Sequence, residues 1–344
     1  MTTVCVYFVA SPLQLLAAKQ IAQTIEAGAR QVLIWYQPGI EPQVHAANWD
    51  ASSYLPWPRR HPLPGLMGRH RRLLANIDLV AALVGRCDTL LLHSAVFDTE
   101  AINYFLRALP RLSGAHTMHA RILPDGLVSI RRYPLSPIKR MAQGVRKLRQ
   151  LMSPTLNYWM FSGDRIGSDA PFCDRIYVLA GLPHEYDPAK VVVLAPLASP
   201  TQGNAQLSAG TTSRRALVIG QTLVSAGLMS TADRDAAALQ IEQWLASCDI
   251  DQIDYKAHPK DPQLELCRPG YRVLDLQEPI EVWLGHTPYH FIVGVRSTVL
   301  LLARQLCAPE TQVVAFGWDR TRFKSAQERS DMRAAFDNAG VIQR

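Results

Sequence analysis

Hydrophobic residues near the start of the chain alternate between short continuous runs and stretches with helical spacing. Residues 4–9 form an apolar run, Ser11 and Pro12 follow, and apolar residues then recur every three or four positions up to residue 22. Ser11 suits a helix N-cap, and Pro12 suits the first turn because its missing N–H needs no partner there. A second run covers residues 31–36. This β-α-β start predicts a parallel sheet.

The same alternation continues through the first half of the chain. The pattern predicts helices over 70–86, 99–109 and 137–152, and strands over 89–93, 120–123, 175–180 and 191–195. Residues 37–68 are rich in Pro and Gly and contain Trp49, Tyr54 and Trp57. They predict a long irregular loop, which in a compact domain is often functional.

A second α/β block follows a Ser/Thr/Gly/Pro/Gln-rich stretch over 199–213. It predicts strands over 216–220, 252–257, 272–275, 290–293 and 311–315, and helices over 231–247, 279–285, 297–305 and 324–338. We therefore predict a Rossmann-like N-terminal domain (1–190), a linker (191–214), a second Rossmann-like domain (215–325) and a C-terminal helix (326–344). Two parallel-sheet domains facing across a cleft form the α/β arrangement called GT-B, with ligands beyond the carboxyl ends of the strands.

Composition narrows the class of protein. The 344 residues are 48% hydrophobic and 19% charged, which fits two independent cores and no disorder. Six cysteines occur without a CxxC or Cys/His cluster, which argues against a zinc site and fits a reducing compartment. The apolar runs are too short for a bilayer span, and Met1-Thr2-Thr3-Val4 lacks the basic region of a signal peptide. The sequence thus predicts a cytoplasmic protein.

The formal charge of +7 is concentrated in two clusters, over 69–72 and 131–149. Such clusters serve nucleic acid, an anionic membrane surface or a polyanionic substrate, or they form an ordinary solvated helix face. No helix-turn-helix, RNA-binding or zinc-finger pattern accompanies them, so we predict no nucleic-acid partner.

Three short motifs follow predicted strands, and each has a structural as well as a functional interpretation. In Leu123-Pro124-Asp125-Gly126, the carboxylate could act as a general base or belong to a plain Asp-Gly turn. His258, before Pro259 and between Lys256 and Lys260, suits an anionic phosphodiester or a basic surface turn. In the stretch 294–298, Ser297 and Thr298 suit a phosphate site at a helix N-terminus or an ordinary cap.

Together these motifs resemble the signature of bacterial GT-B sialyltransferases and polysialyltransferases. That family carries an acidic-acidic-Gly motif, a His-Pro motif and a Ser-Ser/Thr motif in this order, here Asp125-Gly126, His258-Pro259 and Ser297-Thr298. The stretches Ser11–Leu16, Gly220-Gln221 and Pro279–Glu281 also resemble the family, so the resemblance covers about residues 4 to 303.

The resemblance implies an inverting glycosyltransferase of bacterial surface polysaccharide biosynthesis. It would move sialic acid or a related acidic sugar from a CMP-activated donor to a glycan, lipid-linked or polysaccharide acceptor, with no metal or other cofactor. Asp125 would deprotonate the acceptor hydroxyl, and His258 would assist departure of CMP. The residues implied to bind the nucleotide and its phosphate are Gly220, Gln221, Lys256, His258, Pro259, Glu281, Ser297 and Thr298. Those on the acceptor side are Ser11, Gln14 and Gly126.

One position departs from the family pattern, because Pro124 occupies the first acidic position of the motif. Asp125 must then act alone, or the reaction differs. CMP-activated Kdo, pseudaminic acid and legionaminic acid offer the same phosphate, cytidine and carboxylate as CMP-sialic acid, so the donor sugar stays open. A UDP-dependent GT-B transferase or epimerase and a non-catalytic two-domain binding protein are the alternatives.

Two features concern the acceptor and the location of the protein. The aromatic loop with Trp49, Tyr54 and Trp57 fits stacking on sugar faces and packing on the first core equally well. The basic helix around 139–149 fits peripheral attachment to the anionic inner membrane, where lipid-linked glycans are assembled.

Overall fold

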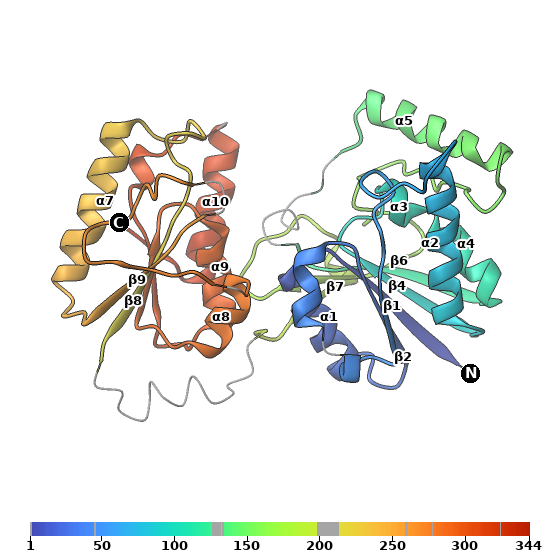
Figure 1. Ribbon diagram of the computed structural model, residues 1–344, viewed down its shortest axis with the longest axis horizontal. Coiled ribbons are helices and arrows are strands. Elements are labelled where there is room, and N and C mark those ends of the chain that lie inside the picture. The colour runs from blue at the N-terminus through green and yellow to red at the C-terminus, as the bar shows by residue number, and fades with distance from the viewer. Residues whose placement is uncertain are drawn as a thin grey trace. The chain divides into compact units, whose positions relative to one another are not determined.

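The computed structural model describes residues 2–44, 46–125, 132, 134–197, 213–258, 261–276, 278–323 and 325–344. Gly126, Pro259 and most of the predicted linker lie outside these residues. The chain divides into two compact units, the first formed by Met1–Val178 and His184–Leu194 and the second by Leu179–Pro183 and Ala195–Arg344. Each unit is a sheet with helices on both faces (Figure 1).

The first unit is built on a seven-stranded sheet in the order β3-β2-β1-β4-β5-β6-β7. Its strands are β1 Thr3–Val9, β2 Arg30–Trp35, β3 Ala51–Tyr54, β4 Thr89–Ser94, β5 Thr117–Ile122, β6 Cys173–Leu179 and β7 Val191–Leu194. Its helices are α1 Pro12–Thr24, α2 Gly68–Val84, α3 Glu100–Asn103, α4 Phe105–Ser113 and α5 Pro137–Lys147. Short 3₁₀ turns cover η1 Pro38–Gln43, η2 Ala46–Asn48, η4 Leu148–Leu151 and η5 Pro188–Lys190.

The second unit is built on a six-stranded parallel sheet in the order β10-β9-β8-β11-β12-β13. Its strands are β8 Arg215–Ile219, β9 Gln252–Lys256, β10 Arg272–Val273, β11 Phe291–Gly294, β12 Gln312–Ala315 and β13 Ile342–Gln343. Its helices are α7 Thr231–Ala246, α8 Ile280–His286, α9 Thr298–Leu306 and α10 Ala326–Ala339, with a 3₁₀ turn η6 Trp318–Arg320.

The two sheets share one topology. Counted from the first strand of each unit, both run 3-2-1-4-5-6, the doubly wound order, and the first sheet adds a seventh strand. The order reverses between β1 and β4 in one unit and between β8 and β11 in the other. Open α/β sheets bind ligands beyond the carboxyl ends of the strands at such a reversal. The predicted fold class, two parallel-sheet domains of the GT-B type, is confirmed.

The central strands of each sheet, such as β1 and β11, are apolar runs because both faces of the sheet are covered there. In β1 every residue from Val4 to Val9 is buried. Helix α2 turns Leu73, Ile77, Val80 and Val84 into the first core, and α7 does the same in the second core with Ala237, Ala238, Ile241 and Leu245. The helical spacing of these residues therefore fixes which side of each helix faces its sheet.

Buried polar groups also lie within each sheet. Asp254 on β9 has no exposed side-chain surface and forms ion pairs of 2.8 Å with Arg215 and with Arg272. Burial alone would raise the pKa of Asp254, but hydrogen bonds from Arg272, Gln252, Tyr289 and Arg215 bring it below the usual value. In the first sheet, His93 on β4 is fully buried and stacks on Tyr7, with ring centroids 4.3 Å apart. Burial, and then the charge of Arg121, hold the pKa of His93 well below its usual value.

The structure differs from the sequence-based expectation at several elements. A short strand, β3, lies within the predicted loop 37–68 and pairs with β2. The predicted helix 99–109 is divided at Tyr104 into α3 and α4. Strand β7 lies in the stretch assigned to the linker and is an edge strand of the first sheet. The short stretch Leu179–Pro183 belongs to the second unit, where Gln305 Nε2 donates to the Ala180 carbonyl at 2.8 Å.

Candidate active site

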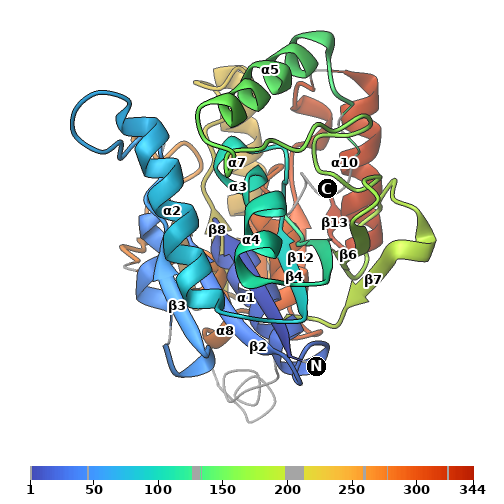
Figure 2. The ribbon, with the colours of Figure 1, turned by 90° about the vertical axis from the view of Figure 1, so that its right-hand side faces the viewer.

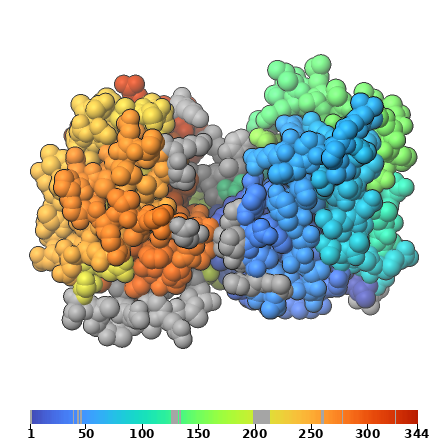
Figure 3. Space-filling view, viewed as in Figure 1, coloured from blue at the N-terminus to red at the C-terminus, as the bar shows by residue number. Residues whose placement is uncertain are grey.

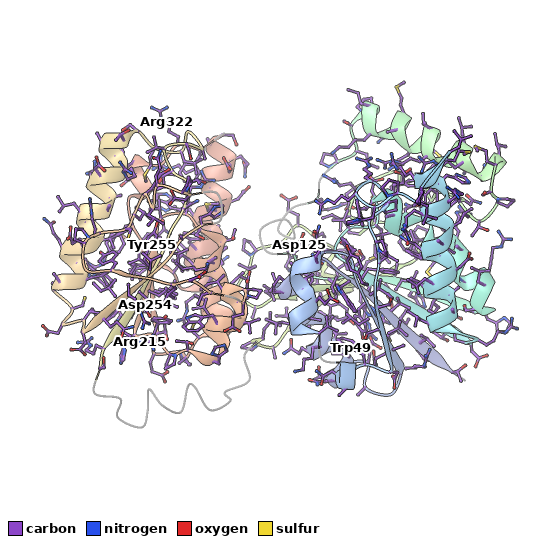
Figure 4. The ribbon with its side chains drawn as sticks, viewed as in Figure 1. Trp49, Asp125, Arg215, Asp254, Tyr255 and Arg322 are labelled. Atoms are coloured by element: carbon purple, nitrogen blue, oxygen red, sulfur yellow. The ribbon has the colours of Figure 1, made fainter. Side chains whose placement is uncertain are left out.

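Asp125 lies just beyond β5 and is joined to the start of α1 (Figure 4). The Gln14 amide donates from Nε2 to Asp125 Oδ1 at 2.8 Å, and its Oε1 accepts the Ala10 N–H at 2.7 Å. Gln14 is buried, and these two bonds determine which end of its amide faces the carboxylate. Ser11 caps the same helix by accepting the Gln14 N–H at 3.2 Å. The structure thus brings the predicted residues Asp125, Gln14 and Ser11 together.

The environment of Asp125 alters its acidity. Burial raises the pKa of this carboxyl above its usual value, and the hydrogen bond from Gln14 opposes that rise. Burial and the nearby charge of Asp125 also raise the pKa of Tyr36, so the phenol stays protonated. A carboxylate of raised pKa accepts a proton more readily, which suits a general base. Tyr36 was not among the predicted site residues, and its one signal was its position directly after β2.

The two tryptophans of the aromatic loop differ in whether they pack on the core or remain accessible to a sugar. Trp49 is buried against Tyr7, with ring centroids 5.5 Å apart, so this tryptophan packs on the core. Trp57 is half-buried and stacks on Tyr36 at 4.9 Å. Trp57 also lines a cavity of about 200 Å³ together with Arg59, Thr99 and Arg146, among others. Stacking on a ligand is therefore open to Trp57 and not to Trp49.

In the second unit, Gly220 follows β8 at the point where the strand order reverses. Its N–H donates to the Lys256 carbonyl at 2.8 Å. A Cβ at this position would lie 2.5 Å from Tyr255 Oη and 2.9 Å from the Lys256 carbonyl oxygen, so the loop requires glycine. The side chain of Gln221 then accepts the Arg296 N–H at 3.2 Å. This bond ties the loop after β8 to the loop after β11.

The start of α9 is an ordinary helix cap whose outer surface is accessible. Ser297 is the N-cap and accepts the Val299 N–H at 3.3 Å, while Thr298 is exposed. Arg296 is turned away from this end, because its guanidinium donates to Glu328 at 3.1 Å and to the Arg322 carbonyl at 2.9 Å. The capping interpretation of Ser297 is confirmed, and the phosphate interpretation stays a prediction.

His258 lies two residues beyond the end of β9, at the same edge of the sheet as Gly220 and Ser297. Strands β9, β8 and β11 are neighbours and parallel, so their carboxyl ends meet there. Lys256, the last residue of β9, and His258 are both half-buried. The His258 carbonyl accepts the Asp261 N–H at 2.9 Å, which shapes the turn. The strand order therefore puts Lys256, His258 and the start of α9 at one edge of the sheet, where a helix N-terminus suits a phosphate.

Comparison with known proteins finds a family similarity that lies mostly in the second unit. Residues 192–314, from β7 to β12, match the family model described as alpha-2,8-polysialyltransferase. The solved α/β-galactoside α-2,3-sialyltransferase of the marine bacterium Photobacterium phosphoreum shares the fold, with a TM-score of 0.54 and 11% identity over 100% of this chain and 98% of that one. Over residues 192–314 the chain therefore resembles the polysialyltransferases, and over its whole length it shares the GT-B fold. The glycosyltransferase of kitacinnamycin also shares the fold, with a TM-score of 0.50 and 13% identity over 100% of this chain and 86% of that one. No curated protein matches the sequence significantly.

Other parts of the predicted site are less closely connected. Glu281 is half-buried in the first turn of α8, and burial raises its pKa. Among the described residues it makes no side-chain hydrogen bond to the other predicted nucleotide-binding residues. Sequence reasoning missed Glu265, a buried carboxylate that accepts the N–H groups of Leu223 and Val224 at 3.1 and 2.8 Å and so holds the loop after β8.

The structure also bears on metal binding and membrane crossing within the described part of the chain. There, no three His, Cys, Asp or Glu side chains gather as metal ligands would. All six cysteines are free thiols. Of the helices whose residues are described, none is long and apolar enough to cross a bilayer.

Proposed function

We propose that the protein is an inverting transferase that moves sialic acid or a related acidic sugar from a CMP donor to an acceptor hydroxyl. The observation that carries this proposal is the Asp125–Gln14 pair: an oriented, half-buried carboxylate of raised pKa at the carboxyl edge of the first sheet. The polysialyltransferase match over residues 192–314 supports the donor class. Glycans, lipid-linked sugars and polysaccharides are the acceptors we expect.

In the proposed reaction, Asp125 takes the proton of the acceptor hydroxyl while that oxygen attacks the anomeric carbon. The bond from the anomeric carbon to the phosphate oxygen breaks, and CMP leaves with its electron pair. His258 assists by donating a hydrogen bond or proton to the departing phosphate. Lys256 adds positive charge, and the start of α9 with Ser297 and Thr298 offers N–H and hydroxyl donors.

The other predicted residues of the second unit would contact the nucleoside. Gly220, Gln221 and Glu281 would lie around the cytidine and its ribose. Asp125 acts without a second carboxylate, because Pro124 stands at that position. The reaction would need no metal or cofactor, and transfer that persists in excess EDTA is the corresponding test.

The decisive experiment measures transfer from CMP-sialic acid and related CMP-sugars by Asp125→Asn and His258→Ala variants. General acid or base catalysis contributes about 10²–10⁴-fold, so each variant should lose at least about 100-fold in turnover. Asp78→Asn and His116→Ala, at exposed positions, are the matched controls and should retain full activity. Melting temperature and CMP binding of Asp125→Asn should stay close to those of the unmodified protein. Full activity of this variant would overturn the mechanism.

The nucleotide distinguishes this function from its alternatives. We expect CMP to raise the melting temperature and UDP, UMP and GDP not to do so, because a ligand stabilises only the state that binds it. A selective response to UDP would favour the UDP-dependent transferase or epimerase. Binding of a CMP-sugar without any transfer would favour a non-catalytic binding protein.

We further propose that the enzyme works at the cytoplasmic face of the inner membrane, held there peripherally. The basic helix α5 supports this location, and its exposed surface gives the attachment a physical basis.

A further inference from the structure

Helix α5 and the turn η4 that continues it bury a polar side and expose an apolar side. A surface helix of a globular protein normally buries its apolar side. In α5 the one buried residue is the polar Gln143, whereas Ile138, Met141 and Val145 are 79%, 74% and 68% exposed. Leu148, Leu151 and Met152 are also exposed. Spacings of three and four residues place most of these side chains along one stripe.

Polar contacts hold the opposite side of α5 against the first unit. The Gln143 amide donates to Asp98 at 3.1 Å and accepts the Phe161 N–H at 3.1 Å. Arg146 donates to the Tyr158 hydroxyl at 2.9 Å, and Arg149 forms an ion pair with Glu100. Asp98 and Glu100 are both buried. Because these bonds fix the polar side inward, the apolar stripe faces outward as a consequence of the fold.

The surroundings of the stripe are strongly cationic. Residues 137–152 contain five Lys or Arg residues and no Asp or Glu. Lys139 and Arg140 are exposed beside the stripe, and Lys147 is half-buried. Figures 1 and 2 both show α5 at the margin of the first unit, and Figure 3 shows its green atoms projecting there. Apolar side chains flanked by cations complement an anionic bilayer, whose interface is apolar below a negatively charged surface.

We propose that residues 137–152 form an interfacial membrane anchor, here called the α5 anchor. Its apolar stripe enters the boundary between headgroups and acyl chains, while Lys139, Arg140 and Lys147 contact lipid phosphates. This proposal deepens and rests on the proposed function, because it brings the first unit to the surface where lipid-linked acceptors lie.

The test is co-sedimentation of the full chain with vesicles of phosphatidylcholine alone or mixed with phosphatidylglycerol. The unmodified protein should bind the mixed vesicles, and added salt should weaken that binding. The combined variant Ile138→Ser/Met141→Ser/Val145→Ser/Leu151→Ser should bind about tenfold or more weakly, because the inserted apolar area is lost. A matched variant, Leu112→Ser/Leu239→Ser/Val273→Ser, removes apolar residues exposed elsewhere and should bind as the unmodified protein does.

The charges are tested separately. Lys139→Gln/Arg140→Gln/Lys147→Gln should lose the preference for phosphatidylglycerol while keeping its stripe. Failure of the unmodified protein to bind, or equal binding by the stripe variant, would overturn the proposal. A concentration-dependent dimer that the stripe variant abolishes, without vesicle binding, would instead make the stripe an interface between copies of the chain. The vesicle assay uses no sugar donor, and transfer to a soluble acceptor does not use the anchor, so failure of one proposal is distinguishable from failure of the other.

Discussion

Replacing Gln14 by Glu tests the proposed catalytic base with a change of one atom. In Gln14→Glu one oxygen can still accept the Ala10 N–H, but the group facing Asp125 Oδ1 across 2.8 Å becomes an oxygen instead of an N–H donor. The bond that favours ionised Asp125 is lost, and a second carboxylate is added beside it. Both changes raise the pKa of Asp125, because two adjacent carboxylates resist simultaneous ionisation.

The size of the effect follows from the lost hydrogen bond. A hydrogen bond to a charged group contributes about 1.5–3 kcal/mol, and one pKa unit corresponds to about 1.4 kcal/mol. Asp125 is half-buried, so water replaces part of the lost bond, and we take about one unit as the rise from this source. A general base works when it is deprotonated. The acidic limb of the profile of kcat/KM against pH should therefore move to higher pH by about one unit or more.

The assay is CMP-sugar transfer measured across pH, supported by NMR titration of the Asp125 carboxyl carbon. Ser11→Ala is the matched control: it removes the cap of α1, at a cost of about 1 kcal/mol in stability, but leaves the Gln14–Asp125 bond. That variant should melt at a lower temperature with an unmoved acidic limb. A folded Gln14→Glu enzyme with the same pH profile as the unmodified protein would refute the assignment of Asp125 as the base.

Three further predictions concern the second unit and the first core. Gly220→Ala should lower the free energy of unfolding by about 1–3 kcal/mol and weaken CMP binding, because the new Cβ meets Tyr255. The control Gly285→Ala should change neither quantity, because its Cβ meets no atom within 4 Å. Calorimetry measures both the stability and the binding. Asp254→Ala should lower the free energy of unfolding, measured in urea titrations, by about 3–5 kcal/mol, because Arg215 and Arg272 lose their buried partner. A loss below about 1 kcal/mol would contradict this prediction. His93 has a folded pKa well below its unfolded one, so below about pH 6.5 the unfolded chain takes up a proton that the folded chain does not. Stability should fall on acidification by up to about 1.4 kcal/mol per pH unit, and His93→Phe should flatten this slope; equal slopes would argue against the assignment.

Most elements of the fold could be predicted from periodicity alone, because the strands are covered on both faces and the helices carry one apolar side. The elements that escaped are those that tertiary pairing creates. Strand β3 reads Ala51-Ser52-Ser53-Tyr54, too short and polar to stand out, and it exists because β2 offers it an edge. Strand β13 has two residues and depends on β12 in the same way.

The candidate site was predictable as residues but not as contacts. Gln14 and Asp125 are 111 positions apart, and only the order of the sheet brings the start of α1 beside the end of β5. The orientation of α5 was equally hidden. Its sequence allows either side to face the core, and the choice is made by Asp98 and Glu100, which lie on another part of the chain.

The chain's path has a consequence for how the protein can be divided. It passes between the units after Val178, Pro183 and Leu194, and the short stretch Leu179–Pro183 contributes to the second unit. The smallest continuous fragment that holds all of the second unit is therefore residues 179–344, and it carries β7 with it, away from the first sheet. A single peptide-bond cleavage therefore cannot release both units intact. Any continuous fragment that contains one complete unit also contains residues of the other.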